Sequence, residues 1–229
     1  MRKIGILCAS DTELAPFLKA MNVSQTTEKA MLRFYEGTLR GISAVAVYSG
    51  VCKVNAAVAA ELLIEVFGAG EVINTGVAGG IDPKVRPFDT VVAERAFYHD
   101  VAEDILTEFH PWMPTIYFPA DEGLLSAARR YAESAERPVL FGTIATGELF
   151  IENAERERIR QKHAPLAADM ETAGAAHVCH VNGVPFLAVR SITDTDEDSG
   201  AEAFERNCER AAEIAAEVTM GLLEQWACV

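Results

Sequence analysis

The sequence has few features of proteins that bind polyanions or cross membranes. Lysine and arginine number 20 against 34 aspartate and glutamate residues, the formal net charge is −14, and no basic run occurs. Nucleic-acid binding is therefore not expected, because it depends on clustered positive charge. No apolar run approaches the roughly 20 residues of a membrane-spanning helix, and the apolar part of the N-terminus is too short for a signal peptide. We therefore expect no membrane association.

Cysteine is present five times but without C-x-x-C spacing. Cys8, Cys179 and Cys208 lie in apolar segments, which favours free buried thiols in a cytoplasmic protein. His177 and His180 share one helical face next to Cys179, which first suggests a metal site. No acidic residue shares that face, so packed or capping histidines are the preferred interpretation. We predict no metal and no other cofactor.

What is present is the pattern of an α/β protein. The chain has 229 residues, half of them apolar, which is long enough for one domain over residues 1–229. Apolar strands alternate with helices, and this predicts a single three-layer α/β/α domain around a mixed central sheet. The expected strands are residues 3–8, 32–39, 42–49, 72–74, 89–94, 139–145, 166–168 and 186–192. The expected helices follow Ser10 or Asp11 and span residues 54–67, 122–135, 154–162, the small-residue segment after Glu171, and 201 to about 226.

A glycine-rich stretch, T-G-V-A-G-G, follows the strand expected at residues 72–74. Glycines there let the backbone approach a ligand closely. The stretch is not G-x-G-x-x-G and no helix clearly follows, which argues against a dinucleotide site. Residues 101–120 form a long aromatic segment without a regular pattern. A loop of this length is usually functional, and Trp112 and Met113 suggest a lid or an oligomer contact.

Three carboxylates are expected near the ends of strands: Glu13, Glu171 and Asp194. Ligands of open α/β sheets bind beyond these strand ends. One acid to deprotonate water, one to hold hydroxyl groups and one to protonate a leaving group would suffice to hydrolyse a glycosidic bond. On position alone Glu13 is better explained by the helix dipole. The pair His99–Asp100 is either an acid–base pair or a loop-shaping element.

Five ordered motifs resemble the bacterial 5′-methylthioadenosine/S-adenosylhomocysteine nucleosidases, and the likeness covers essentially the whole chain. The resemblance implies a nucleoside phosphorylase-like fold, usually as a homodimer. It also implies hydrolysis of methylthioadenosine, S-adenosylhomocysteine and 5′-deoxyadenosine to adenine and the 5-substituted ribose. The motifs are N-T-G-V-A-G-G (74–80), Y-H-D (98–100), T-G-E-L-F-I (146–151), D-M-E-T-A-G-A-A-H-V-C-H (169–180) and V-P-F-L-A-V-R-S-I-T-D (184–194).

The resemblance assigns the catalytic roles to two of the acids. Asp194 is expected to protonate adenine N7, and Glu13 to activate the water that attacks C1′. Glu171 is expected to accept hydrogen bonds from the ribose 2′- and 3′-hydroxyls, with Met170 packed on the sugar. A useful acid needs a raised pKa, which burial and neighbouring carboxylates would give Asp194.

The remaining substrate-binding residues implied by the resemblance surround the base and the 5′-substituent. Phe150 is expected to stack on adenine, and the backbone of Ile151 to read its edge. Gly79 is expected to let the backbone approach the ligand. Phe204, in the last helix, is expected to close the 5′-alkylthio pocket.

The chain departs from the usual form of these motifs at four positions. Val77 stands for a serine near the sugar, so a hydroxyl is lost there. Cys52 replaces a glycine, Asp169 replaces a glutamate, and Phe88 replaces the glycine before Asp89. These changes bear on rate and on the preferred 5′-substituent, because both candidate catalytic acids are retained.

Two other functions compete with hydrolysis. A phosphorylase of the same fold would need arginines around phosphate, and none precedes the glycine motif. A nucleoside-binding or storage protein would need neither Glu13 nor Asp194 as an acid or a base. Both are less consistent with the sequence than a nucleosidase.

Overall fold

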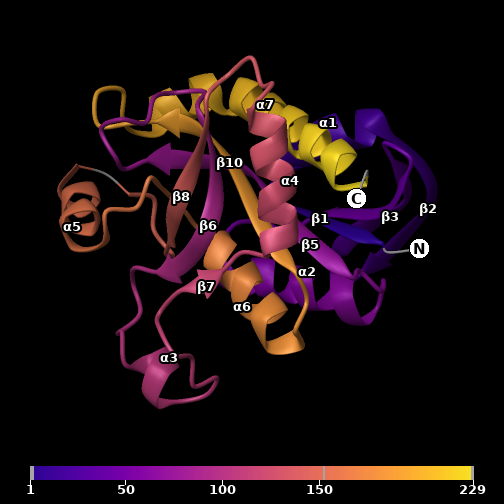
Figure 1. Cartoon of the computed structure of the whole chain (residues 1–229), viewed down its shortest axis with the longest axis horizontal. Helices are drawn as coiled ribbons and strands as arrows, with labels where there is room; N and C mark the ends of the chain where they lie inside the picture. Colours follow the sequence, from indigo (N-terminus) through magenta and orange to yellow (C-terminus); the bar gives the residue numbers. More distant parts are fainter. Residues whose placement is uncertain (1–2, 152, 228–229) are drawn as a thin grey trace.

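A mixed sheet of ten strands organises the computed structural model, which describes residues 3–151 and 153–227 (Figure 1). The strands are β1 (Ile4–Cys8), β2 (Met21–Lys29), β3 (Leu32–Leu39), β4 (Ile42–Tyr48), β5 (Glu71–Gly80), β6 (Thr90–Tyr98), β7 (Phe118–Pro119), β8 (Val139–Thr146), β9 (Ala167–Asp169) and β10 (Phe186–Asp194). The helices are α1 (Asp11–Ala20), α2 (Lys53–Glu65), α3 (Ile105–Glu108), α4 (Glu122–Ala132), α5 (Asn153–His163), α6 (Thr172–Asn182) and α7 (Ala201–Ala227).

Strand β5 is the junction of the sheet. It pairs in parallel with β1 on one side and with β10 on the other, and its last residues pair antiparallel with β9. From β10 the pairing continues through β6 and β8 back to β9, so these five strands close a ring. Beyond β1 the sheet extends as β4, β3 and β2. The carboxyl ends of β1, β5 and β10 therefore meet at one place.

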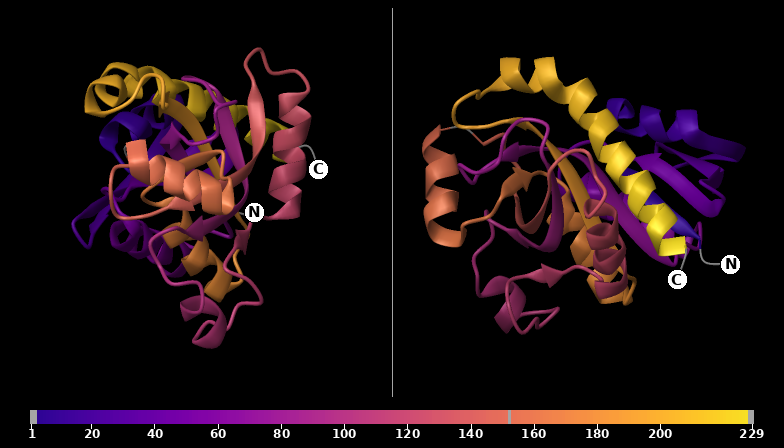
Figure 2. Two further views of the ribbon diagram at one scale, coloured as in Figure 1. Left: turned by 90° about the vertical axis from the view of Figure 1, so that its left-hand side faces the viewer. Right: turned by 45° about the horizontal axis from the view of Figure 1, so that its top comes forward.

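The helices cover the two faces of the sheet. Helices α1, α4 and α7 pack on one face, and α2 and α6 pack on the other (Figures 1 and 2). Strand β1 shows why: Ile4 and Ile6 face the α7 side, whereas Leu7 faces the α2 side, as the two-residue period of a strand requires. The predicted three-layer architecture around a mixed sheet is thereby confirmed. Helix α5 stands at the edge of these layers (Figure 2).

Three local differences from the expected elements have physical reasons. Strand β2 was not anticipated because its sequence, M-N-V-S-Q-T-T-E-K, is polar and almost wholly exposed, and pairing with β3 is what makes it a strand. The glycine motif lies inside β5 and is not a loop after it, because β10 and β9 pair with it up to Gly80. The segment 101–120 contains the short helix α3 and strand β7. Within the described part of the chain, no helix combines the length and the apolar character needed to cross a membrane.

Candidate active site

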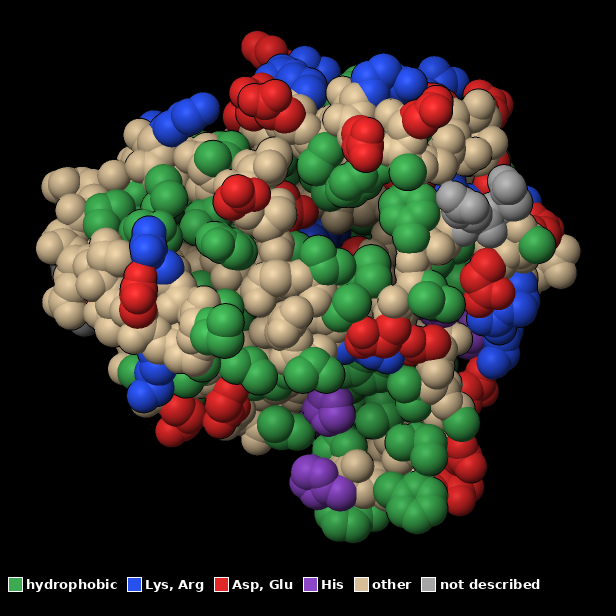
Figure 3. All heavy atoms as spheres, turned by 180° about the vertical axis from the view of Figure 1, so that it is seen from behind, with side chains coloured by type: hydrophobic (Ala, Val, Ile, Leu, Met, Phe, Trp, Pro, Cys, Tyr) green, Lys and Arg blue, Asp and Glu red, His purple; other side chains and the backbone are tan. Residues whose placement is uncertain are grey.

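One cavity of about 230 Å³ is lined by nine residues that the sequence predicted for catalysis or substrate binding. Figure 3 shows the hollow, with acidic and basic side chains in its depth and hydrophobic side chains at its border. A cavity of this order of size can hold a small molecule. The nine predicted residues are Glu13, Val77, Gly79, Phe150, Ile151, Met170, Glu171, Asp194 and Phe204.

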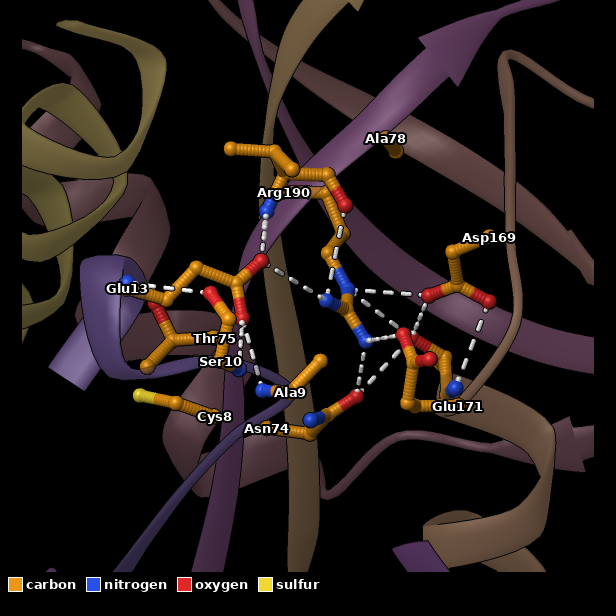
Figure 4. Close-up of polar contacts among 12 residues, drawn as sticks. Cys8, Ala9, Ser10, Glu13, Asn74, Thr75, Ala78, Asp169, Glu171 and Arg190 are labelled. Carbon is orange, nitrogen blue, oxygen red and sulfur yellow. Dashed lines mark hydrogen bonds and ion pairs between the residues drawn. The ribbon is translucent and has the colours of Figure 1, made fainter. Parts of the chain in front are cut away.

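Glu13 is held by backbone donors from two strand ends. Its Oε2 accepts from the N–H groups of Ala9 at 2.6 Å and Ser10 at 3.0 Å, and its Oε1 accepts from Val77 N–H at 2.8 Å (Figure 4). The side chain also completes the capping box of α1 with Ser10. A Cβ atom at Gly76 would collide with this carboxylate, so the glycine makes room for it. Glu13 therefore serves both as a helix cap and as a carboxylate in the cavity.

Arg190, which sequence reasoning did not single out, lies at the centre of the acidic groups. Its guanidinium is fully buried and lies 2.8 Å from Asp169, 3.4 Å from Glu171 and 4.0 Å from Glu13 (Figure 4). It also donates to the side-chain oxygen of Asn74. A signal for it did exist, because an arginine within an otherwise apolar strand must have buried partners. One cation thus compensates three buried acids.

Glu171 lies at the N-cap of α6, between Arg190 and the loop before α2. Its Oε1 accepts from Cys52 N–H at 2.9 Å. Burial raises the pKa of Glu171 to about 7, with Asp169 and Glu13 acting in the same direction and Arg190 opposing them. Cys52 donates this hydrogen bond from a backbone φ of 86°, a conformation that favours the glycine it replaces.

Asp194 ends β10 and is 1% exposed. Its Oδ2 accepts from Arg156 Nη2 at 2.6 Å, and its Oδ1 accepts from the Thr193 hydroxyl at 2.7 Å. The charged group nearest this acid is therefore a cation, and not the carboxylates that we expected. A Cβ atom at Gly79 would lie 3.3 Å from Asp194 Oδ2, so the glycine keeps the backbone close to the acid. Arg156 is the second functional residue that sequence reasoning missed.

Aromatic and aliphatic side chains form the rest of the cavity wall. Phe150 and Phe204 meet edge to face, with ring centroids 6.0 Å apart, and Phe150 remains 44% exposed. Val77 packs against the α7 residues Ala211 and Ala212, and Phe204 packs against the same group. Val77, which stands where the usual motif has serine, thus extends the apolar wall of the cavity. The backbone carbonyl of Ile151 accepts from Arg156 Nη2 at 3.3 Å.

The other candidates do not line this cavity. Asp100 accepts from Lys53 Nζ at 2.8 Å and from Glu148 N–H at 3.0 Å, so the loop-shaping alternative for the pair His99–Asp100 is favoured. Trp112 is 66% exposed, whereas Met113 is buried in the core, which does not favour a lid or an oligomer contact for Met113.

The histidines of α6, His177 and His180, lie against the ring of Phe118. The ring of His177 stacks on Phe118, and its Nδ1 lies 3.3 Å from the Tyr98 hydroxyl. Within residues 3–151 and 153–227, no group of three or more His, Cys, Asp or Glu side chains is placed to hold a metal ion. Cys8 and Cys179 are free and buried, and Cys208 is free and half-buried; Cys228 lies outside the described residues.

Comparisons with known proteins show which family the chain resembles in sequence and in fold. The model of the phosphorylase superfamily matches residues 3–224. A 5′-methylthioadenosine/S-adenosylhomocysteine nucleosidase of Psychromonas ingrahamii is 36% identical over 93% of this chain and 94% of its own length. A nucleosidase of the same name from Colwellia psychrerythraea, solved with adenine, superposes with a TM-score of 0.89 at 31% identity, covering 98% of this chain and 96% of that one. A futalosine hydrolase of Helicobacter pylori superposes with a TM-score of 0.88 at 28% identity, covering 98% of each chain.

The matches extend over nearly the full length of the chain and confirm the predicted family and fold. The chain belongs to the 5′-methylthioadenosine/S-adenosylhomocysteine nucleosidase family, a group of N-glycosyl hydrolases within the phosphorylase superfamily.

Proposed function

We propose that the protein hydrolyses the N-glycosidic bond of 5′-methylthioadenosine and S-adenosylhomocysteine, and also of 5′-deoxyadenosine. The products are adenine and the 5-substituted ribose. The observation that carries the proposal is the convergence of Glu13, Glu171 and Asp194 in one small cavity. The names of the relatives support the substrate class.

In the proposed reaction, Asp194 gives its proton to adenine N7 as the bond between C1′ and N9 breaks. The bonding electron pair goes to the base, which leaves as neutral adenine. Water adds to C1′ and loses a proton to Glu13. Positioned acid or base catalysis of this kind is typically worth about 10²–10⁴-fold each. Exchange with solvent then removes the proton that Glu13 gained and restores the one that Asp194 lost.

Glu171, which lies beside one cation and two other acids, is suited to bind the sugar. Its carboxylate can accept hydrogen bonds from two ribose hydroxyls, and its negative charge stabilises the positive charge that develops on the sugar ring. Phe150 is suited to stack on adenine at the open side of the cavity. The apolar wall of Val77 and Phe204 suits an alkylthio group.

Hydrolysis is favoured over phosphorolysis by the charges near Glu13. Arg190 does come within 4.0 Å of Glu13, but Asp169 and Glu171 already neutralise it. A phosphate ion would therefore meet a net negative site.

The test is to incubate the protein with methylthioadenosine, with and without phosphate, and to follow adenine. We expect phosphate-independent release that falls at least 100-fold in Asp194→Asn, about the lower end of what a positioned acid contributes. Phosphate-dependent release would favour a phosphorylase, and absence of release would favour a binding protein. A variant that keeps more than about a tenth of wild-type kcat would exclude Asp194 as the acid.

The proposed assembly is a homodimer. Ile105, Phe109 and Trp112 of the α3 segment are 44%, 59% and 66% exposed. This segment forms the lobe at the bottom of Figure 3, where hydrophobic side chains reach the surface. Exposed Val54 and Val181 border an adjoining groove between α2 and α6. An apolar surface of this kind is usually covered by a partner, and the second copy is the partner that the family resemblance implies.

The cytoplasmic location inferred from the cysteines remains a prediction.

A further inference from the structure

Arg156 is a buried cation on a helix whose other described charged residues are at least partly exposed. Helix α5 carries the sequence N-A-E-R-E-R-I-R-Q-K-H and lies at the edge of the molecule (Figure 2). Arg156 is nevertheless 1% exposed and lines the cavity. A long charged side chain is rarely buried to this extent unless it is paired. Its partners therefore indicate what it does.

The guanidinium joins three parts of the cavity wall. Nη2 donates to Asp194 Oδ2 at 2.6 Å and to the carbonyl of Ile151 at 3.3 Å, and Nη1 donates to the carbonyl of Gly80 at 2.9 Å. On its outer side Nε lies 3.5 Å from Asp196. The two carbonyl contacts do not depend on the charge of Asp194. Arg156 therefore keeps hydrogen-bond acceptors whether Asp194 is protonated or ionised.

The surroundings of Asp194 can accommodate both of its protonation states. When Asp194 is ionised, Thr193 Oγ1 donates to Oδ1 at 2.7 Å and Arg156 donates to Oδ2. When Asp194 carries a proton, the Thr193 hydroxyl can instead donate to the carbonyl of Ala78 at 3.2 Å. The hydrogen bonds allow either state, and the charge of Arg156 attracts the carboxylate more strongly than the neutral acid.

We propose that Arg156 is a positioning residue that stabilises the carboxylate left on Asp194 when its proton passes to the purine. The proposal rests on the proposed nucleosidase function. As the O–H bond of Asp194 breaks and the N–H bond at N7 forms, a carboxylate appears beside a fixed cation. Because this attraction is larger after the transfer than before it, Arg156 lowers the barrier. Arg156 itself neither gains nor loses a proton.

The charged groups that face the pair lie on both sides of it. Outward, Asp196 contacts Arg156, and Arg160 Nη1 donates to Asp196 at 2.6 Å. Inward, Asp194 shares its cavity with Glu13, Asp169 and Glu171. Arg190 lies against these three acids.

The experiment compares Arg156→Met with Arg160→Met in steady-state kinetics with methylthioadenosine. Both arginines attach α5 to the body of the protein, since Arg160 bonds Asp196 and the carbonyl of Ile81, but Arg160 does not contact Asp194. In Arg156→Met we expect kcat to fall by about 10-fold, a part of the acid's whole contribution, because the carboxylate formed on Asp194 loses its cation. KM should change little, because this attraction grows only as the proton is transferred. Arg160→Met should keep kcat close to the wild type.

Arg156→Lys guards against a folding defect. It keeps the charge but loses the fork, so its kcat should lie closer to the wild type than that of Arg156→Met. An unchanged kcat in a folded Arg156→Met, or an equal loss in Arg160→Met, would overturn the proposal and leave Arg156 a structural residue. If Arg156→Met does not fold, Arg156→Gln takes its place, and a wild-type kcat in that neutral variant would overturn the proposal as well. Failure of the nucleosidase function itself is distinguishable, because the wild type would then release no adenine.

Discussion

Replacing Glu13 with glutamine tests whether one side chain both caps a helix and acts as a base. The carboxylate accepts three backbone N–H groups, from Ala9, Ser10 and Val77. An amide has one oxygen, so its nitrogen must face at least one of these donors. The smallest loss occurs when the oxygen keeps Ala9 and Ser10 and the nitrogen faces Val77. The variant should therefore lose stability as well as activity.

The size of both effects can be worked out from these contacts. A buried N–H left without a partner at Val77 costs about 1–3 kcal/mol. For a domain of this size, that corresponds to a fall in Tm of roughly 2–12 °C. Loss of a positioned base lowers kcat by about 10²–10⁴-fold. Helix-dipole complementarity alone would predict only about 0.3–1 kcal/mol and no loss of activity.

The assay pairs thermal unfolding with adenine release, and Ser10→Ala is the matched control. This control removes the hydroxyl that accepts from Glu13 N–H at 3.3 Å but leaves the backbone donors of Ser10 and Ala9 in place. We expect it to cost about 0.5–2 kcal/mol of stability while kcat stays close to the wild type. Wild-type turnover in Glu13→Gln would refute the assignment of the base. An inactive Glu13→Gln variant with unchanged Tm would refute the hydrogen-bond account.

Two further predictions concern pH and assembly. Because burial raises the pKa of Glu171 from 4.5 to about 7, the folded protein holds a proton that the unfolded chain has lost in that interval. The free energy of unfolding should therefore fall as pH rises from about 4.5 through 7, and thermal unfolding of Glu171→Gln should lack this component; parallel pH profiles of the two proteins would contradict it. We also expect residues 101–120 to contribute to the 5′-substituent pocket of the partner subunit, so Trp112→Ala should weaken dimerisation and raise KM for the alkylthio nucleosides, as measured by sedimentation and steady-state kinetics. A fully active wild-type monomer at micromolar concentration would refute the dimer, whereas lost dimerisation with unchanged KM would refute only the pocket shared between subunits.

The layered fold could be predicted because its strands carry their own signal. The buried strands β1 and β10 are apolar runs, and α1 begins at a capping box that can be read directly from Ser10 and Glu13. Strand β2 has no such signal, since its polar residues become a strand only by pairing with β3. The glycine motif was expected to follow a strand at residues 72–74, but it forms the second half of β5. The sequence does not reveal this because the pairing partners of the motif, β9 and β10, lie far along the chain.

The acids of the site could be predicted, but their cations could not be placed. Carboxylates at strand ends point to a ligand site by position alone, and the family resemblance supplied their roles. Arg190 could have been noticed as a charge within an apolar strand, although its three partners come from distant segments. Arg156 had no signal at all, because Arg158 and Arg160 follow it at alternate positions and only the fold decides which one is buried.

The sharing of Arg190 among three acids has a consequence for mutagenesis. Glu13, Asp169 and Glu171 repel one another and compete for one guanidinium. Removing one acid therefore lowers the repulsion on the other two and leaves them a larger share of the positive charge. Their contributions are therefore energetically coupled, and residues in one network commonly show interaction energies of about 0.5–3 kcal/mol. Losses measured in single variants at Glu13 and Glu171 should not sum to the loss in the double variant. Roles within this cluster can be separated by double-mutant cycles, and an alanine scan would count the same electrostatic imbalance more than once.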